Sequence, residues 1–238
     1  MSQDKIMIVD NEMEIIQLMR LYLSREGYNV VWATDSTKAI SLLQEELPDL
    51  ILLDIVMPGL SGIDLCGQIR NFSSAPIIFV SCKSDEMDKV LGLSIGGDDY
   101  ITKPFSPAEL IARVKAHLRR KTLSEVSGKP PESSQQISYG TLSIDLEAHS
   151  VFLAGDQVHL TAKEFELLTL LCKYPNRVFT LKQIFDNLWD SYGIDDDYRT
   201  VNVHIYNIRK KIEYDPDQPK YIQTVRGVGY KFIGLQKN

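Results

Sequence analysis

The chain has 238 residues, of which 44% are hydrophobic and 24% charged, and its formal net charge is −6. This composition is typical of a globular protein with one or two domains, and the negative charge argues against a protein that coats nucleic acid. No apolar stretch approaches a membrane-spanning length, and the N-terminal sequence lacks the basic and apolar regions of a signal peptide. The cysteines, Cys66, Cys82 and Cys172, are scattered and odd in number, so we expect buried thiols in a cytoplasmic protein.

Residues 1–120 alternate short apolar runs with amphipathic stretches. Four of the five runs (KIMIV, YNVVWA, DLILL, PIIFV and DYITK) are dominated by aliphatic and aromatic residues, as in strands that are buried on both faces. The stretches that follow them space their apolar residues at three and four, which is typical of helices; the fourth covers residues 86–96, and the fifth opens with Ser106 and Pro107. We therefore expect an α/β domain with a doubly wound, five-stranded parallel sheet and five helices.

Residues 121–136 differ in composition from both neighbouring regions. Their sequence, KTLSEVSGKPPESSQQ, is rich in Ser, Pro, Gly and Gln and holds only two aliphatic side chains. Such a segment cannot bury a core, so it is interpreted as a linker.

Residues 137–238 show a different pattern, which predicts a second domain. Residues 138–161 alternate apolar and polar side chains between turn signals, as in antiparallel strands. Three helices are expected, roughly over Ala162–Lys173, Leu181–Leu188 and Thr200–Tyr214, the first with Thr161 and Glu164 as a capping box. The C-terminal segment KYIQTVRGVGYKFIG reads as two strands around a Gly-rich turn, so the whole predicts a winged helix-turn-helix α+β domain.

Polar residues follow four of the five predicted parallel strands. Asp10 ends the first and Asp54 the third, and two carboxylates that meet in one crevice repel each other unless a cation or proton neutralises them. Oxygen ligands of this kind suit Mg²⁺. Ser81 and Lys103 end the fourth and fifth strands, which gives a set suited to phosphoryl transfer with Asp54 as the nucleophile. Taken singly, an Asp after a strand is more often a turn or cap residue, and Lys103 could be a solvated loop lysine.

The motifs IVDNE, LLDIVMPG, PIIFVS and GGDDYITKPF resemble, in order and spacing, those of the receiver domain of two-component response regulators, which has a flavodoxin-like fold. The resemblance implies that Asp54 accepts a phosphoryl group from a sensor histidine kinase and that Mg²⁺ is required. It further implies that Ser81 binds a phosphoryl oxygen, that Lys103 pairs with the phosphoryl group, and that Tyr100 is the aromatic switch residue. The implied metal ligands are Asp10, the residue at position 11, Asp54 and the backbone carbonyl of Val56.

Position 11 departs from the family pattern, which usually has two adjacent acids after the first strand. Asp10 matches the first acid, but Asn11 replaces the second. An amide oxygen can still bind a hard cation, although the site loses one negative charge, so we expect weaker Mg²⁺ binding and slower phosphorylation. A regulator that works without phosphorylation remains an alternative, and an engineered Asp-to-Asn change is another.

The predicted third helix of the second domain is basic. An apolar stripe at spacings of three and four consists of Val201, Ile205, Ile208 and Ile212, which leaves the other residues on more exposed faces. The candidate DNA-contacting residues of this helix are Arg199, Thr200, Asn202, Val203, His204, Tyr206, Asn207 and Lys210. A basic helix alone is usually only solvated, but Arg226 in the Gly-flanked turn of the terminal hairpin suits entry into a minor groove.

The motifs LTAKEFELLTLL, RTVNVHIYNIRKKIE and YIQTVRGVGYKF resemble the winged-helix effector domain of the OmpR/PhoB class. The class implies double-stranded DNA with direct repeats as the ligand, and contacts to its backbone or minor groove by Thr224, Arg226 and Tyr230. Asn202 stands where the class often has Asp, and Tyr206 stands where Arg or Ser is common, so the class pattern does not assign a base preference to these positions. The segment WDSYGIDDDYR would contact RNA polymerase, although its acidic run could equally be a solvated loop.

The resemblance also implies a homodimer of receivers, formed through the fourth helix, fifth strand and fifth helix. The charges for reciprocal pairs are present as Lys89 with Glu109, Asp99 with Arg113, and Asp98 with Arg120. Exposed pairs contribute only about 0–1 kcal/mol each, so they would fix the two-fold arrangement more than strengthen it. The alternative is ordinary surface charge on a helix.

The sequence therefore predicts a transcriptional regulator that is switched by phosphorylation of Asp54 and by receiver dimerisation. The rival from another class is an enzyme, a Mg²⁺-dependent phosphatase or hydrolase on the same three-layer fold. Against it, no further acid–base residue follows the predicted strands, and an enzyme would not need a winged helix.

Overall fold

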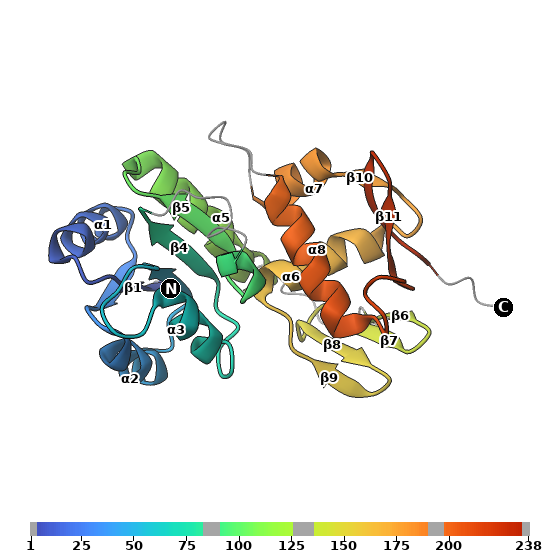
Figure 1. The fold of residues 1–238 in the computed structure, drawn as a ribbon, viewed down its shortest axis with the longest axis horizontal. Helices are drawn as coiled ribbons and strands as arrows, with labels where there is room; N and C mark the ends of the chain where they lie inside the picture. Colours follow the sequence, from blue (N-terminus) through green and yellow to red (C-terminus); the bar gives the residue numbers. More distant parts are fainter. Residues whose placement is uncertain (1–3, 83–90, 126–135, 190–197, 235–238) are drawn as a thin grey trace. The chain divides into compact units, whose positions relative to one another are not determined.

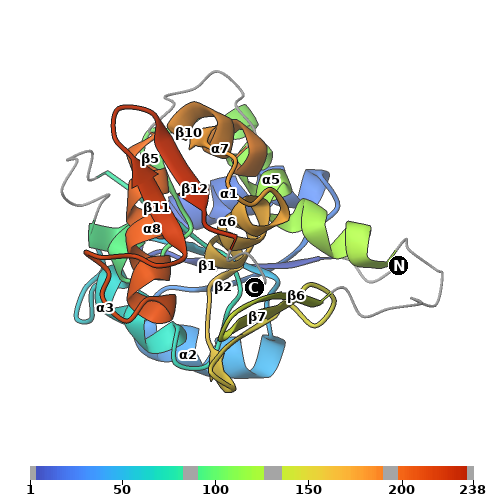
Figure 2. The same cartoon turned by 90° about the vertical axis from the view of Figure 1, so that its right-hand side faces the viewer.

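A computed structural model describes residues 4–82, 91–125, 136–189 and 198–234, without the side chains of residues 119–125. The chain folds into two compact units, Met1–Arg120 and Lys121–Asn238, and each is described by itself (Figures 1 and 2). Within the described residues, no helix is long and apolar enough to cross a membrane.

The first unit contains the predicted five-stranded parallel sheet. Its strands are β1 (Lys5–Val9), β2 (Asn29–Ala33), β3 (Leu50–Leu53), β4 (Ile77–Ser81) and β5 (Asp99–Thr102), in the order β2-β1-β3-β4-β5. The helices are α1 (Met13–Arg25), α2 (Ser36–Glu46), α3 (Gly62–Ile69) and α5 (Pro107–Glu125). The helix expected over residues 86–96 lies partly outside the described residues, of which 91–94 are helical. The predicted fold is confirmed for this unit.

Both faces of the sheet are buried, which explains the nearly continuous apolar strands. In β1, Met7 and Val9 pack with residues of α2 and α3, whereas Ile6 and Ile8 pack with residues of α1 and α5. Figure 1 shows these helix pairs on opposite sides of the sheet. With both faces covered, the edge at the C-terminal ends of the strands remains for polar side chains.

Helix α5 continues into the segment that was interpreted as a linker. It ends at Glu125, and β6 begins at Gln136, the last residue of that segment. The physical reason is that residues 121–125 contain neither Gly nor Pro; Gly128 and Pro130 are the first helix breakers after Pro107.

The second unit combines two antiparallel sheets with three helices. One sheet has the order β6-β7-β8-β9 and consists of β6 (Gln136–Tyr139), β7 (Leu142–Asp145), β8 (Ser150–Leu153) and β9 (Asp156–Val158). The other has the order β10-β12-β11, with β10 (Phe179–Thr180), β11 (Ile222–Val225) and β12 (Gly229–Phe232). The helices are α6 (Ala162–Lys173), α7 (Leu181–Leu188) and α8 (Arg199–Ile212), and the Thr161–Glu164 capping box opens α6. The predicted winged helix is confirmed, and β10 is an addition to it.

Helix α8 ends two residues earlier than predicted because Glu213 is extended and binds the following chain. The Glu213 carboxylate accepts hydrogen bonds from the backbone N–H groups of Lys220, Tyr221 and Ile222 at 2.8–2.9 Å. These bonds tie the end of α8 to the start of β11. Helix α8 and the terminal hairpin are therefore connected covalently and by hydrogen bonds.

Candidate functional site

Asp10 and Asp54 lie at the point where the strand order of the parallel sheet reverses. Asp10 follows β1 and Asp54 follows β3, and these strands are neighbours in the sheet. The Asp10 N–H donates to the carbonyl of Ala33 at 3.2 Å, and the Asp54 N–H donates to the carbonyl of Val9 at 2.8 Å. The ladder thus continues into both residues and holds their carboxylates at one edge, with only 1% and 3% of each residue exposed.

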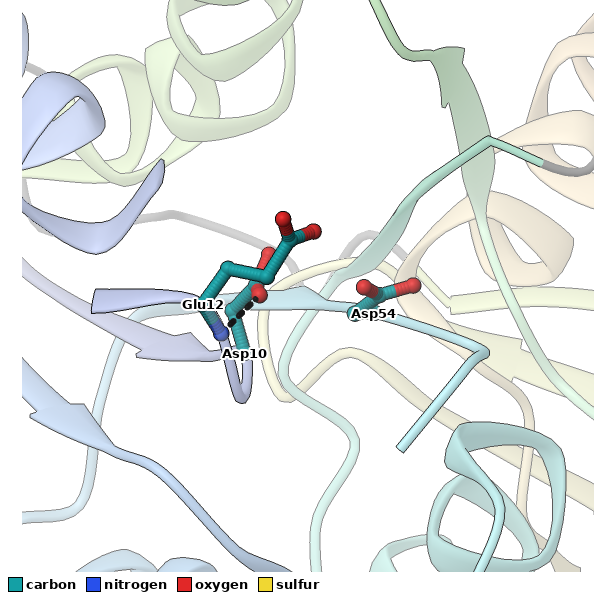
Figure 3. Close-up of side chains that lie close together, drawn as sticks. All are labelled: Asp10, Glu12 and Asp54. Carbon is teal, nitrogen blue, oxygen red and sulfur yellow. Dashed lines mark hydrogen bonds between the residues drawn. The ribbon is translucent and has the colours of Figure 1, made fainter. Parts of the chain in front are cut away.

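Lys103, which follows β5, places its ammonium group among these carboxylates. Its Nζ is 2.7 Å from Asp10 Oδ2, 2.8 Å from Asp54 Oδ2 and 3.3 Å from Glu12 Oε1. The sequence predicted that Asp10, Asp54 and Lys103 converge, and the structure brings all three together. Figure 3 shows the carboxylates of Asp10, Glu12 and Asp54, whose ligand atoms lie within 4.8 Å of one another.

The electrostatics of this cluster favour a cation. Burial raises the pKa of Asp10 above its usual value, although hydrogen bonds from Lys103 and Glu12 act in the opposite direction. Burial alone would lower the pKa of Lys103, but its hydrogen bonds to Asp10 and Asp54 outweigh burial and raise that pKa. The ammonium group is therefore held in its charged form, and it offsets only part of the acidic charge around it.

Glu12 was not among the predicted metal ligands, whereas Asn11 was. Asn11 is exposed, and Glu12 is the N-cap residue of α1 without using its side chain to cap the helix. The Glu12 backbone N–H donates to Asp10 Oδ1 at 2.8 Å, and this turn brings the Glu12 carboxylate over the end of β1 (Figure 3). The signal in the sequence was Glu12 itself, a third polar residue after Asp10 and Asn11 and directly before the helix. From there its side chain can turn back over the end of the strand.

The backbone around Asp54 requires a glycine at position 62. Asp54 Oδ1 accepts a hydrogen bond from the Val56 N–H at 3.0 Å, which fixes the orientation of the carboxylate. A Cβ on Gly62 would lie 1.8 Å from the carbonyl oxygen of Asp54, and the Gly62 N–H donates to the carbonyl of Ile55. The start of α3 can therefore approach the end of β3 only because residue 62 has no side chain.

Ser81 and Tyr100 lie on the two strands beyond β3. Ser81 is the last residue of β4, is buried, and pairs in register with Thr102 of β5. Tyr100 of β5 is also buried, with its ring centroid 6.4 Å from that of Phe79. The switch roles implied for both residues stay predictions.

The residues present fit a divalent metal by the chemistry of their donors. Asp10, Glu12 and Asp54 offer hard carboxylate oxygens. The amide ligand expected from Asn11 stays a prediction. The ammonium group of Lys103 already lies at hydrogen-bonding distance from all three acids, so this part of the sheet edge attracts positive charge.

The charged residues expected at a dimer interface make contacts inside the first unit. Asp99 binds Arg113 at 2.9 Å and His117 Nε2 at 3.2 Å. Burial would raise the pKa of Asp99, but Arg113 and His117 together hold it well below its usual range.

A correction concerns Asp98, which was predicted to pair with Arg120 across an interface. Asp98 is fully buried, and its carboxylate binds Arg70 at 2.7 Å and the Ile77 N–H at 2.9 Å. Because these contacts enclose the carboxylate, Asp98 presents no charge at the surface of this unit. Glu109 contacts Arg113 at 3.3 Å, whereas Lys89 and the side chain of Arg120 lie outside the described residues.

A second correction concerns four residues of α8 that were placed on exposed faces. Thr200, Val203, His204 and Asn207 are buried, in addition to the predicted apolar stripe. For His204, the reason is Trp189, which follows α7 and lies 5.4 Å away between ring centroids. Helical periodicity located the apolar stripe correctly but could not show what packs beside it. Contact of these four side chains with DNA would require that they first be uncovered.

The remaining candidates on α8 and the hairpin are mostly accessible. Arg199, Asn202, Tyr206, Lys210, Thr224 and Arg226 are exposed, and Tyr230 is half-buried. Of the segment proposed to contact RNA polymerase, residues 189–199, the part from 190 to 197 lies outside the described residues.

Arg209, which was not a candidate, connects α8 to the hairpin. Its guanidinium group donates to the carbonyl of Ile222 at 2.7 and 3.1 Å and to Thr224 Oγ1 at 2.8 Å. The Tyr230 hydroxyl donates to Asn202 Oδ1 at 3.0 Å, which adds a second connection. These bonds fix the hairpin relative to the exposed side of α8, so both can meet one ligand together.

Comparisons with known proteins agree with both units. Residues 6–115 match the response regulator receiver domain, and residues 155–232 match the C-terminal domain of transcriptional regulatory proteins. The DNA-binding response regulator MtrA of Mycolicibacterium smegmatis is 40% identical over 229 residues, or 96% of each chain.

Two solved structures are also similar over nearly the whole length of the chain. The response regulator DrrB of Thermotoga maritima, an OmpR/PhoB homologue, is 32% identical, with 98% of this chain and all of DrrB covered and a TM-score of 0.51. A RitR mutant is 26% identical, with 96% of this chain and 98% of the RitR chain covered and a TM-score of 0.76.

Proposed function

The chain belongs to the response regulators that join a receiver domain to a C-terminal DNA-binding domain of the OmpR/PhoB class, and on that premise we propose that phosphorylation of Asp54 switches its binding to DNA. The observation that carries the proposal is the position of Asp54: buried at the sheet edge and held in contact with Lys103. We place the receiver in residues 1–120 and the DNA-binding domain in residues 137–238, with residues 121–136 as the linker.

The proposed donor is a phosphohistidine of a sensor kinase. A carboxylate oxygen of Asp54 forms a bond to phosphorus, the nitrogen–phosphorus bond breaks, and the freed imidazole takes up a proton. Lys103 offsets charge on the phosphoryl oxygens, and the Val56 N–H keeps the Asp54 carboxylate oriented. When bound, Mg²⁺ would stabilise the charge that develops on the phosphoryl group.

The signal then passes through Ser81 and Tyr100. The Ser81 hydroxyl would donate a hydrogen bond to a phosphoryl oxygen, and Tyr100 would follow it inward. The helix–strand–helix face that carries Lys89, Asp99, Glu109 and Arg113 would then pair two receivers. Asp99 contacts Arg113 and His117 of its own chain, which supports the position of these charges on this face but not their pairing between two receivers. These contacts would have to rearrange for reciprocal pairing.

The output is binding of a homodimer to direct repeats of double-stranded DNA. Arg199, Asn202, Tyr206 and Lys210 would face the major groove from α8, while Arg226 would enter the minor groove from the hairpin. Thr224 and Tyr230 would contact the DNA backbone, and RNA polymerase would meet the segment between α7 and α8. The three cysteines are free thiols, which supports a reducing, cytoplasmic environment; Cys66 and Cys172 are buried as expected, whereas Cys82 is exposed.

The test is to incubate the full chain with acetyl phosphate across a Mg²⁺ series and to read intact mass, oligomeric state and DNA binding. We expect the mass of one phosphoryl group to be gained, dimers to form and DNA binding to tighten, and all three changes to be lost in Asp54→Ala. No mass gain at any Mg²⁺ concentration, with DNA binding intact, would instead favour the phosphorylation-independent regulator. No comparison with known proteins favours that alternative.

A further inference from the structure

The position of Glu12 bears on the charge that Asn11 leaves out of the receiver site. The Glu12 carboxylate is half-exposed, lies 3.3 Å from Lys103 Nζ, and belongs to the same cluster as Asp10 and Asp54. Asn11, the neighbouring residue, is exposed and uncharged. The chain therefore keeps three acids at this sheet edge, although the residue between Asp10 and Glu12 is an amide.

The charge balance shows why the third acid matters. With Asn11 neutral, Asp10 and Asp54 contribute two negative charges, and the ammonium group of Lys103 cancels one of them. A hard divalent cation binds oxygen sites according to their charge as well as their geometry, so one net negative charge makes a weak site. Glu12 restores the second net charge.

The local backbone holds Glu12 beside the cluster, which distinguishes it from the other acid at the start of α1. The Glu12 N–H is bonded to Asp10 Oδ1, so Glu12 is fixed to a proposed metal ligand through its own backbone. Its side chain is directed to the cluster and does not cap α1. Glu14, two residues later, is an exposed acid in the first turn of α1, and it does not belong to the cluster.

We propose that Glu12 supplies the negative charge that the divalent-cation site lacks at Asn11. The proposal rests on the proposed function, because it concerns the same site. It predicts that the importance of Glu12 depends on the residue at position 11. Asn11 and Glu12 then act as a pair: an amide that can offer an oxygen, and a neighbouring carboxylate that brings the charge.

The experiment measures Mg²⁺ binding directly, without a phosphate donor. Isothermal titration calorimetry of the full chain is carried out with Glu12→Gln, Glu14→Gln, Asn11→Asp and the double variant Asn11→Asp/Glu12→Gln. The Mg²⁺-dependent rise in the thermal midpoint provides a second readout of the same affinity. Glu14→Gln is the matched control, since it removes the same charge from the same end of α1.

We expect Glu12→Gln to weaken Mg²⁺ binding about tenfold, which corresponds to about 1.4 kcal/mol. Glu14→Gln should change it less than about twofold, since an exposed charge outside the site is screened by salt. In the Asn11→Asp background, loss of the Glu12 carboxylate should cost less than about threefold, because the adjacent Asp then supplies the charge.

Four results would overturn the proposal. Equal losses in Glu12→Gln and Glu14→Gln would reduce the effect to general electrostatics. Equal losses with Asn and with Asp at position 11 would mean that Glu12 acts independently of Asn11. No Mg²⁺ binding by the wild-type chain, or none lost in Glu12→Gln, would remove Glu12 from the site. Failure of the proposed function would look different. Mg²⁺ would bind, and the effect of Glu12 on its affinity would depend on the residue at position 11, but acetyl phosphate would add no phosphoryl mass.

Discussion

The receiver and the DNA-binding domain hold their functional charges in opposite ways. At the sheet edge, Asp10, Asp54 and Lys103 are buried and bound to one another. On α8 and the hairpin, the basic residues Arg199, Lys210 and Arg226 are exposed. A buried charge depends on its partner, whereas an exposed charge is stabilised by water and remains available to a ligand. Substitution of one of these buried charges should therefore change stability, whereas substitution of one of these exposed basic residues should change binding.

The largest effect is expected for Lys103→Met, which leaves the acids of the sheet edge without their cation. Removing one member of a buried ion pair costs a few kcal/mol, so we expect the free energy of unfolding of the receiver to fall by roughly 3 kcal/mol in metal-free buffer. Urea denaturation would measure it. The control is Lys115→Met, whose partner Glu26 is 2.5 Å away but whose own side chain is 53% exposed; it should cost less than about 1 kcal/mol. Equal losses in the two variants would abolish the contrast between buried and exposed charges.

Asp99→Asn should also lower the free energy of unfolding, because Asp99 is a buried charge. The size of this loss should vary with pH. Asp99 is buried against Arg113 and His117, and its pKa in the folded chain is lower than in the unfolded chain. A lowered carboxyl pKa contributes stability above the unfolded value of 3.8, and that stability is lost as pH falls below it towards the folded value. The substitution should thus cost about 2 kcal/mol at pH 7 and less at pH 3. Thermal unfolding of both proteins across this pH range would show it, and a cost that is constant with pH would contradict it.

The smallest effect on stability, and the clearest on binding, is expected for Arg226→Ala. Arg226 is exposed in the turn of the hairpin, so the free energy of unfolding should change by less than about 0.5 kcal/mol. Binding to a DNA duplex selected by the wild-type chain from a random library should weaken about tenfold, and the salt dependence should fall by about one ion. Fluorescence anisotropy over a salt series measures both.

Arg209→Ala provides the matched control for Arg226→Ala, because it removes the same charge from the same domain. Arg209 donates three hydrogen bonds to Ile222 and Thr224, so its loss should lower the free energy of unfolding by about 2 kcal/mol. If the Arg226 variant were the less stable of the two, the division between a binding arginine and a structural one would be wrong.

Features that follow from topology or periodicity could be predicted from the sequence, whereas features that depend on contacts between elements could not. The convergence of Asp10, Asp54 and Lys103 follows from topology alone, because parallel strands of one sheet end at one edge. The role of Glu12 could not be derived in the same way, since it depends on how the chain turns between β1 and α1. Periodicity found the buried stripe of α8, but the burial of His204 depends on Trp189 from another element. Charge pairing misled in the case of Asp98, which has a partner, Arg70, on α3's C-terminal side rather than at the surface.

The close approach at Gly62 has a genetic consequence. Every other L-amino acid would place a Cβ against the carbonyl of Asp54, so we expect substitutions at position 62 to be as poorly tolerated as those at Asp54, the proposed phosphoryl acceptor. A screen for loss of regulation would recover mutations in codon 62, although the glycine that it encodes has no side chain that takes part in chemistry. Such alleles would resemble those of Asp54 in phenotype, yet they would arise from a displaced backbone and not from lost chemistry.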